Sequence, residues 1–158
     1  CEEAMNSKIK DFFNRIKLGK LTYFGIAIKQ LISAKKTACD LFLDDDNEPI
    51  HINRLLFTVS MIHRFEGGGF KFCPTADCTD GRFELCVAGD VPKPVILLAL
   101  PTAFFGKHYM VPGIHAFHAE KITIKTNKPL WVHTDGEVHE MADFLEISCR
   151  QKTIPMIV

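Results

Sequence analysis

The chain has 158 residues, of which 47% are hydrophobic and 24% are charged, with 19 Lys and Arg and 19 Asp and Glu. This length fits one domain, which can build a core without disulfides or metals to staple it. The balanced charge excludes the basic character typical of nucleic-acid-binding domains, so we expect no nucleic-acid partner.

Two helices are predicted near the start of the chain. Apolar residues recur at helical spacing within residues 9–16 and again within 21–32, and Gly19 between them indicates a break. Residues 1–36 contain eight Lys and Arg against three Asp and Glu. Such a basic helical face can meet acidic lipid headgroups, but it is also typical of a helix face in solvent.

Strands are predicted next. Residues 39–62 indicate two strands joined by an acidic turn, because Leu55, Phe57, Val59 and Met61 occupy alternate positions. After them, "EGGGFKFCP" predicts a Gly-rich corner that leads into a short strand, and "DGRFELCVAGD" predicts an Asp-Gly turn followed by a further strand.

A short buried helix is predicted to interrupt the strands. Pro94 suits a first helical turn, and the apolar residues behind it suit a core position. This run, residues 94–105, is broken by Pro101 and is shorter than the ~20 residues that span a bilayer. Strands are predicted again over residues 114–126, 129–134, 142–149 and 153–158. The expected fold is therefore α+β, predominantly an antiparallel two-layer β-sandwich with N-terminal helices and one short internal helix.

The acidic turn is a poor calcium site, although Asp44, Asp46 and Glu48 occupy alternate positions. Pro49 stands where a calcium loop needs glycine, and Leu55 stands where its bidentate glutamate belongs. We therefore interpret the segment as a hairpin turn in solvent, on the turn preferences of its residues.

The six cysteines show no C-x-x-C spacing and come with no visible signal peptide. Cys73, Cys78 and Cys86 lack a second ligand pair at zinc spacing, so we expect reduced thiols in a cytosolic protein. His115 and His118 would point to opposite faces of a strand and could not share a metal. The glycines of "EGGGFK" match no phosphate-binding motif, which leaves a tight corner as their expected role.

Two acidic turns remain as candidate sites. In "TADCTDG", Asp77 and Asp80 could bring a carboxylate and neighbouring carbonyl oxygens to Mg²⁺, which takes one or two carboxylates and completes its shell with water. In "HTDGEV", an Asp-Gly pair predicts a two-residue hairpin with Glu137 at the start of the returning strand. The residues alone also allow plain explanations, an ordinary turn and a surface glutamate.

The motifs in order resemble a known family. The segments "GGGFKFCPTADCTDGRFELCVAGDV", "FFGKHYMVPGI" and "ITIKTNKPLWVHTDGEV" are similar to the C-terminal half of the diacylglycerol-kinase-type lipid kinases, which include bacterial diacylglycerol kinases and the sphingosine and ceramide kinases. The resemblance implies a two-domain enzyme whose N-terminal domain, with a Gly-Gly-Asp-Gly-Thr motif, binds ATP, while the C-terminal β-sandwich offers the lipid.

The resemblance implies that residues 1–158 are the C-terminal domain. The sequence has no Gly-Gly-Asp-Gly-Thr motif and starts at Cys1 rather than Met, so we expect a piece that lacks the ATP-binding domain and the first strand of its own domain. Such a piece should be inactive alone. The whole protein is expected to be cytoplasmic and peripheral at the inner membrane face, with a homodimer possible in principle.

The resemblance also assigns roles to residues. It implies that Glu137 accepts the proton of the lipid hydroxyl, and that Asp80 binds a structural Mg²⁺ through its side chain. Asp77 and Arg82 would contribute main-chain carbonyls, and ATP would be the co-substrate. Gly106 to His108 match a family element with no role assigned here.

Two further hypotheses stay open at this point. The chain could be a non-catalytic lipid- or membrane-binding module, as its basic N-terminal residues suggest, or a structural β-sandwich that mediates oligomerisation.

Overall fold

The computed structural model describes residues 29, 31–66, 69–135 and 137–150. The predicted helix at 9–16, most of the second helix and the strand at 153–158 lie outside these residues. The elements are β1 (Thr37–Leu43), β2 (Ile50–Met61), β3 (Phe83–Gly89), α3 (Lys93–Ala103), the 3-10 helix η3 (His108–Met110), β4 (Ile114–Ala119), β5 (Lys121–Thr134) and β6 (Glu137–Ser148).

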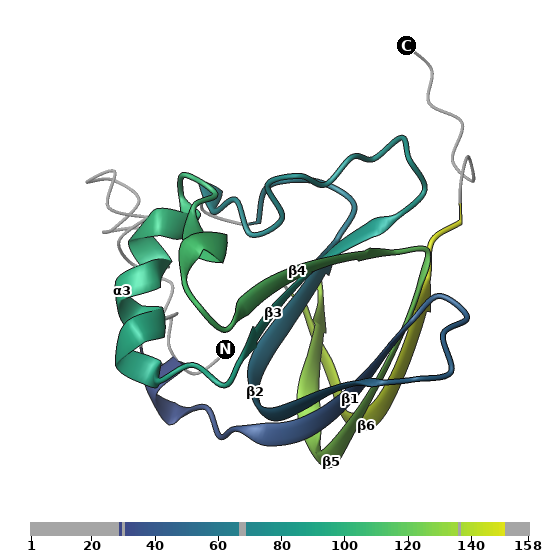
Figure 1. Ribbon diagram of the computed structural model, residues 1–158, viewed down its shortest axis with the longest axis horizontal. Helices are drawn as coiled ribbons and strands as arrows, with labels where there is room; N and C mark the ends of the chain where they lie inside the picture. Colours follow the sequence, from purple (N-terminus) through teal and green to yellow (C-terminus); the bar gives the residue numbers. More distant parts are fainter. Residues whose placement is uncertain (1–28, 30, 67–68, 136, 151–158) are drawn as a thin grey trace.

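The six strands form one antiparallel sheet in the order β4-β3-β2-β1-β5-β6. The sheet curls strongly, so that β5 and β6 lie across the direction of β2 and β3, and α3 lies at one side (Figure 1). The predicted antiparallel α+β fold is confirmed, and curling of a single sheet is what makes it sandwich-like.

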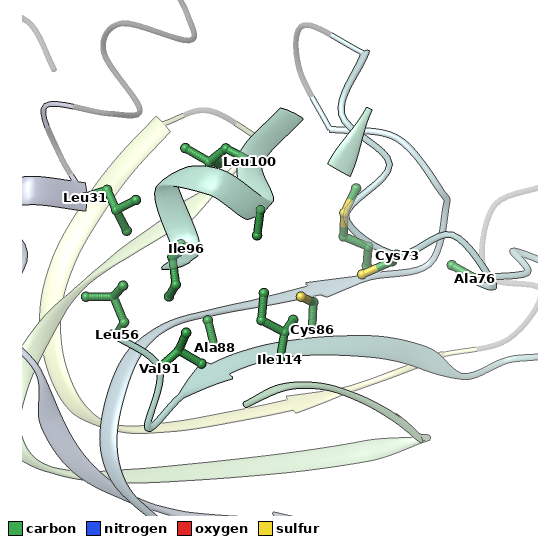
Figure 2. Close-up of a cluster of buried hydrophobic side chains, with 12 residues drawn as sticks. Leu31, Leu56, Cys73, Ala76, Cys86, Ala88, Val91, Ile96, Leu100 and Ile114 are labelled. Carbon is green, nitrogen blue, oxygen red and sulfur yellow. The ribbon is translucent and has the colours of Figure 1, made fainter. Parts of the chain in front are cut away.

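The sheet has a core on each face. The strand core consists of Cys39, Leu41, Ile52, Leu55, Leu85, Val87, Ala119, Ile122 and Ile124. The helix core joins α3 to the other face and consists of Leu31, Leu56, Met61, Cys73, Ala76, Cys86, Ala88, Val91, Ile96, Ala99, Leu100 and Ile114. Figure 2 shows Ile96 and Leu100 of α3 above Leu56, Ala88 and Ile114 of the strands. Strand β3 is buried on both faces, and such strands are usually continuously hydrophobic.

The predicted alternation in β2 is wrong at Leu55. The pairing of β2 with β3 shifts register between Leu55 and Phe57. Leu55 therefore packs in the strand core, while Phe57 and Val59 pack against the helix core. A β-bulge inserts one residue into a strand and so changes the face that later side chains occupy.

The predicted strand at 114–126 is divided at Glu120. Its first half, β4, pairs with β3, and its second half, β5, pairs with β1. The carboxylate of Asp44 stabilises the corner, because its Oδ1 accepts the backbone N–H groups of Glu120 at 2.6 Å and Lys121 at 3.1 Å. The acidic turn is therefore a structural element as well as a hairpin.

The helix predicted from Pro94 is confirmed as α3, with Pro92 as its N-cap and Pro101 near its end. The short strand predicted after the Gly-rich corner is wrong, since Glu66 and Phe70 form only an isolated bridge. The segment instead packs as a loop on the helix core, with Cys73 and Ala76 buried. Within the described residues, no helix has the length and apolar character needed to cross a membrane.

Candidate functional site

The predicted metal turn is a compact loop in which aspartates bind the backbone that follows them. Oδ1 of Asp77 accepts the Thr79 N–H at 2.9 Å and the Thr79 hydroxyl at 2.7 Å. Oδ1 of Asp80 accepts the Arg82 N–H at 2.8 Å, and Gly81 has a φ of 73°. The bonds from the hydroxyl and amide of Thr79 lower the pKa of Asp77, so its carboxylate stays ionised to lower pH.

The turn suits a hard cation in the type of its donor atoms. Asp77 and Asp80 are both exposed, and the Asp77 carbonyl receives only a long bond, 3.4 Å, from the Asp80 amide. An ionised carboxylate has about four acceptor positions, so one or two bonds do not exhaust it. In the described residues, no three or more His, Cys, Asp or Glu side chains gather as a metal site. A cation here would therefore need carbonyl oxygens and water besides carboxylate.

A buried carboxylate that the sequence analysis missed lies at the start of the turn. Glu84 of β3 is fully buried on the same face as Cys86 and Ala88. Its Oε2 accepts both the N–H and the hydroxyl of Thr75, each at 2.8 Å, and its Oε1 accepts the Tyr109 hydroxyl at 2.7 Å. His118 lies on the exposed side, with Nε2 at 3.2 Å from the Thr75 hydroxyl oxygen and 4.0 Å from Glu84 Oε2.

The Gly106-Lys107-His108 element secures the loop that leads to the turn. The buried His108 places Nε2 at 3.0 Å from the Phe72 carbonyl oxygen, and the Tyr109 hydroxyl lies 2.9 Å from the same oxygen. Gly106 has a φ of +67°, and a Cβ added there would lie 2.8 Å from Cβ of Pro74. The glycine therefore permits both a left-handed turn and close approach to the loop. This gives the element a structural role.

The Arg82 side chain points to a second anchor. Its guanidinium donates to Oδ2 of Asp44 at 3.0 Å. At Asp44, burial opposes ionisation but is outweighed by the amides of Lys121 and Glu120 and by Arg82, which together lower the pKa of Asp44. The Asp77–Arg82 turn is thus connected to the Glu120 corner through the Arg82 side chain and Asp44.

Glu137 occupies a different setting. It begins β6 and pairs with Thr134 across a two-residue connection, in which Asp135 has a φ of 50°. The hairpin is confirmed, while Gly136 lies outside the described residues. Beyond Thr126, β5 pairs with β6 alone among the described residues, since β1 pairs with β5 over Ile122–Thr126. Glu137 is exposed. None of the described residues forms a hydrogen bond or ion pair with its carboxylate.

The predicted residues therefore form two separate features. Asp77, Asp80 and Arg82 share the turn, whereas no interaction among the described residues connects Glu137 to them. The missed residue Glu84 had a signal in the sequence, because it is the charged residue in the otherwise uncharged strand FELCVAG. Such a residue is rarely buried without partners.

The cysteines that the structure describes are free thiols, as expected. Cys39, Cys73 and Cys86 are buried free thiols, and Cys78 is an exposed one. Burial raises the pKa of Cys39 to about 11 and that of Cys86 to about 12, which keeps both thiols protonated at neutral pH.

Comparison with known proteins shows which family the chain belongs to. The model of the family described as "YegS C-terminal NAD kinase beta sandwich-like domain" matches residues 3–156. The chain belongs to this family. The match includes the Asp77–Arg82 turn and the Glu137 hairpin.

Relatives of this YegS C-terminal domain are named as lipid kinases. The chain is 28% identical over 139 residues to a protein of Bacillus subtilis named "Putative lipid kinase YtlR", and this covers 87% of the chain and 44% of that protein. It is 24% identical over 136 residues to a protein of Mycobacterium tuberculosis H37Rv named "Diacylglycerol kinase", covering 85% of the chain and 43% of that protein. The chain therefore spans less than half the length of these relatives.

A solved structure shares the fold. A crystal structure described as that of "a putative diacylglycerol kinase from Bacillus anthracis str. Sterne" superposes with a TM-score of 0.66 at 18% identity, covering 94% of this chain and 45% of that one. At this identity the likeness concerns the fold alone.

Proposed function

We propose that the chain is the C-terminal domain of a two-domain lipid kinase that transfers a phosphoryl group from ATP to a lipid hydroxyl, on diacylglycerol or a similar alcohol. The names of its relatives support a lipid kinase, and the length of those relatives supports a further domain, to which we assign the binding of ATP. This domain would contribute the proton acceptor, a structural Mg²⁺ site and the lipid-facing surface.

The observation that carries the proposal is the setting of Glu137. Phosphoryl transfer depends on positioning and charge, and a carboxylate commonly orients the attacking hydroxyl and accepts its proton. Glu137 is exposed and without a partner among the described residues, at a backbone position set by its pairing with Thr134. Its carboxylate is therefore available to a hydroxyl brought to it between this domain and an ATP-binding domain.

Mg²⁺ would be held by the Asp80 side chain and by the carbonyls of Asp77 and Arg82, with water in the remaining positions. When bound, it would supply a fixed positive charge that orders the turn. The residues fit Mg²⁺ in the type of their donor atoms. Asp77 and Asp80 are both exposed, and carboxylate oxygens are ligands that hard cations prefer.

The decisive test is Glu137→Gln in the full-length protein, assayed for transfer of labelled phosphate from ATP to diacylglycerol. We expect kcat to fall by about 10²–10⁴-fold, because proton transfer by a positioned side chain contributes that much. Glu140→Gln, an exposed glutamate on the same strand, is the matched control and should retain wild-type activity. Loss of less than about tenfold in Glu137→Gln would remove the assignment.

A lipid substrate requires peripheral contact with a membrane, and exposed apolar residues of α3 and of the segment after it suit such contact. Leu98 on α3, Phe105 after it and Met110 in η3 are 78%, 74% and 80% exposed, and Lys107, which lies between Phe105 and Met110 in the sequence, is exposed too. Apolar side chains beside a basic one favour insertion at an anionic membrane surface. This observation also supports the alternative, a membrane-binding module without catalysis.

Vesicle sedimentation tests this surface. We expect the chain to sediment with vesicles rich in phosphatidylserine. The double variant Leu98→Asp, Phe105→Asp should reduce the bound fraction by at least threefold, since both changes replace an exposed apolar side chain with a charge. Retention by vesicles together with full phosphorylation activity in Glu137→Gln would favour the non-catalytic module over the role assigned to Glu137.

A further inference from the structure

The buried carboxylate of Glu84 connects the helix core to the metal turn. Its two oxygens accept three hydrogen bonds, two from Thr75 and one from Tyr109, at 2.7–2.8 Å. A buried carboxylate costs much free energy unless such donors surround it. The position of Glu84 therefore also restricts where its donors can lie.

Thr75 precedes Asp77 by two residues, so Glu84 holds the chain where it enters the turn. Both the N–H and the hydroxyl of Thr75 are directed to a single oxygen of Glu84. Where the turn ends, Arg82 is bound to Asp44, which also holds the Glu120 corner. The turn is thus anchored at both ends, where it begins by the buried Glu84 and where it ends by the exposed Asp44.

Tyr109 links the Glu84 carboxylate to the backbone at Phe72. Its hydroxyl lies 2.7 Å from Glu84 Oε1 and 2.9 Å from the Phe72 carbonyl oxygen. Burial is the main cause that raises the pKa of Tyr109, and the neighbouring Cys86 raises it further. The phenol therefore remains protonated and can donate at any physiological pH. The same carbonyl is held by His108.

We propose that Glu84 is a positioning residue that sets the cation affinity of the Asp77–Arg82 turn by fixing Thr75. This inference rests on the cation site in the proposed function. Groups that hold metal ligands in place typically change metal affinity by about 10–100-fold when they are removed. Glu84 would act in this way without touching the cation.

The test measures binding of Mn²⁺ alone to the full chain by electron paramagnetic resonance, because carboxylate, carbonyl and water ligands suit Mn²⁺ as well as Mg²⁺. Glu84→Leu should raise the Kd by about 10–100-fold. Glu84→Gln should stay within about threefold of wild type, because its carbonyl can accept from Thr75 while Tyr109 donates to Phe72 and accepts the amide N–H.

Leu100→Ala is the control for a purely structural effect. Leu100 lies in the same helix core and has no polar contact with the turn, so its truncation should lower stability and leave the Kd unchanged. If Glu84→Leu fails to fold, Thr75→Val replaces it, since Thr75 is exposed and loses only one of the two bonds to Glu84. We expect a Kd at least threefold higher for this variant.

A second readout separates this inference from the cation site itself. Amide hydrogen exchange at Thr79 and Arg82, whose N–H groups bind Asp77 and Asp80, reports the turn without any metal. Exchange at both amides should accelerate at least tenfold in Glu84→Leu, or at least threefold in Thr75→Val, and stay unchanged in Leu100→Ala. Absence of Mn²⁺ binding in wild type with this acceleration would reject the cation site but retain Glu84 as the anchor. Unchanged exchange in the Glu84 or Thr75 variant would overturn the inference.

Discussion

The two candidate features of this domain are built in opposite ways. The Asp77–Arg82 turn is tied to the core through Thr75 and Glu84 and to a neighbouring corner through Asp44. The Glu137 hairpin stands where β5 and β6, among the residues that the structure describes, pair only with each other, and it carries the exposed apolar residues Trp131, Val138 and Met141. The turn is preorganised within the domain, whereas the hairpin presents its carboxylate outward, as a site completed by another surface requires.

In a comparison of the turn with the hairpin, the larger effect on folding is expected at Tyr109. Tyr109→Phe removes one donor from the buried Glu84 carboxylate, and such a loss costs about 1–3 kcal/mol, toward the upper end when the acceptor is charged. Urea unfolding followed by circular dichroism measures it.

Thr134→Val is the matched change in the hairpin, since it also removes one hydroxyl, the partner of His139. At this exposed position we expect a change within about 0.5 kcal/mol. Equal losses in the two variants would mean that the turn and the hairpin are held alike, contrary to the comparison above.

An intermediate effect is expected from pH through His108. Burial lowers the pKa of His108 below its ordinary 6.5, an effect that its bond to Phe72 and the nearby Glu84 only partly oppose. The folded chain therefore favours neutral His108, and the stability that this provides is present above about pH 6.5 and is lost as the pH falls below it.

Urea midpoints recorded from about pH 7.5 to about pH 5.5 test this sign in wild type and in His108→Gln. The decline on acidification should be smaller in His108→Gln. His115→Gln, on the exposed side of β4, should follow the wild-type curve. A steeper decline in His108→Gln than in wild type would show that the protonated form is the one favoured by folding.

An effect as small as that of Thr134→Val is expected at Trp131, which is 62% exposed and faces Met141 across the hairpin. Trp131→Ser should change the free energy of unfolding by no more than about 0.5 kcal/mol, because exposed positions rarely contribute more. A loss of unfolding free energy above about 1.5 kcal/mol, measured by urea unfolding followed by circular dichroism, would show that the hairpin packs against the rest of the domain.

Much of the fold is readable from local sequence. The acidic turn within residues 39–62 predicts the pair β1 and β2, Pro94 predicts α3, and Asp-Gly pairs predict both the turn before β3 and the Glu137 hairpin. These signals work because strand alternation, proline geometry and turn conformation depend on residues close together in the chain. The family motifs likewise lie on contiguous stretches, which is why their resemblance was visible without a structure.

The contacts that join distant segments could not be read in this way. Nothing near Glu84 in sequence indicates that Thr75 and Tyr109 surround it, and nothing near Asp44 indicates that it holds residues 120 and 121. The bulge at Leu55 and the change of partner at Glu120 also depend on the register of the whole sheet. Local conformation follows from neighbours along the chain, whereas burial of a charge and the face a strand presents depend on which segments pack together, and only the folded sheet decides that.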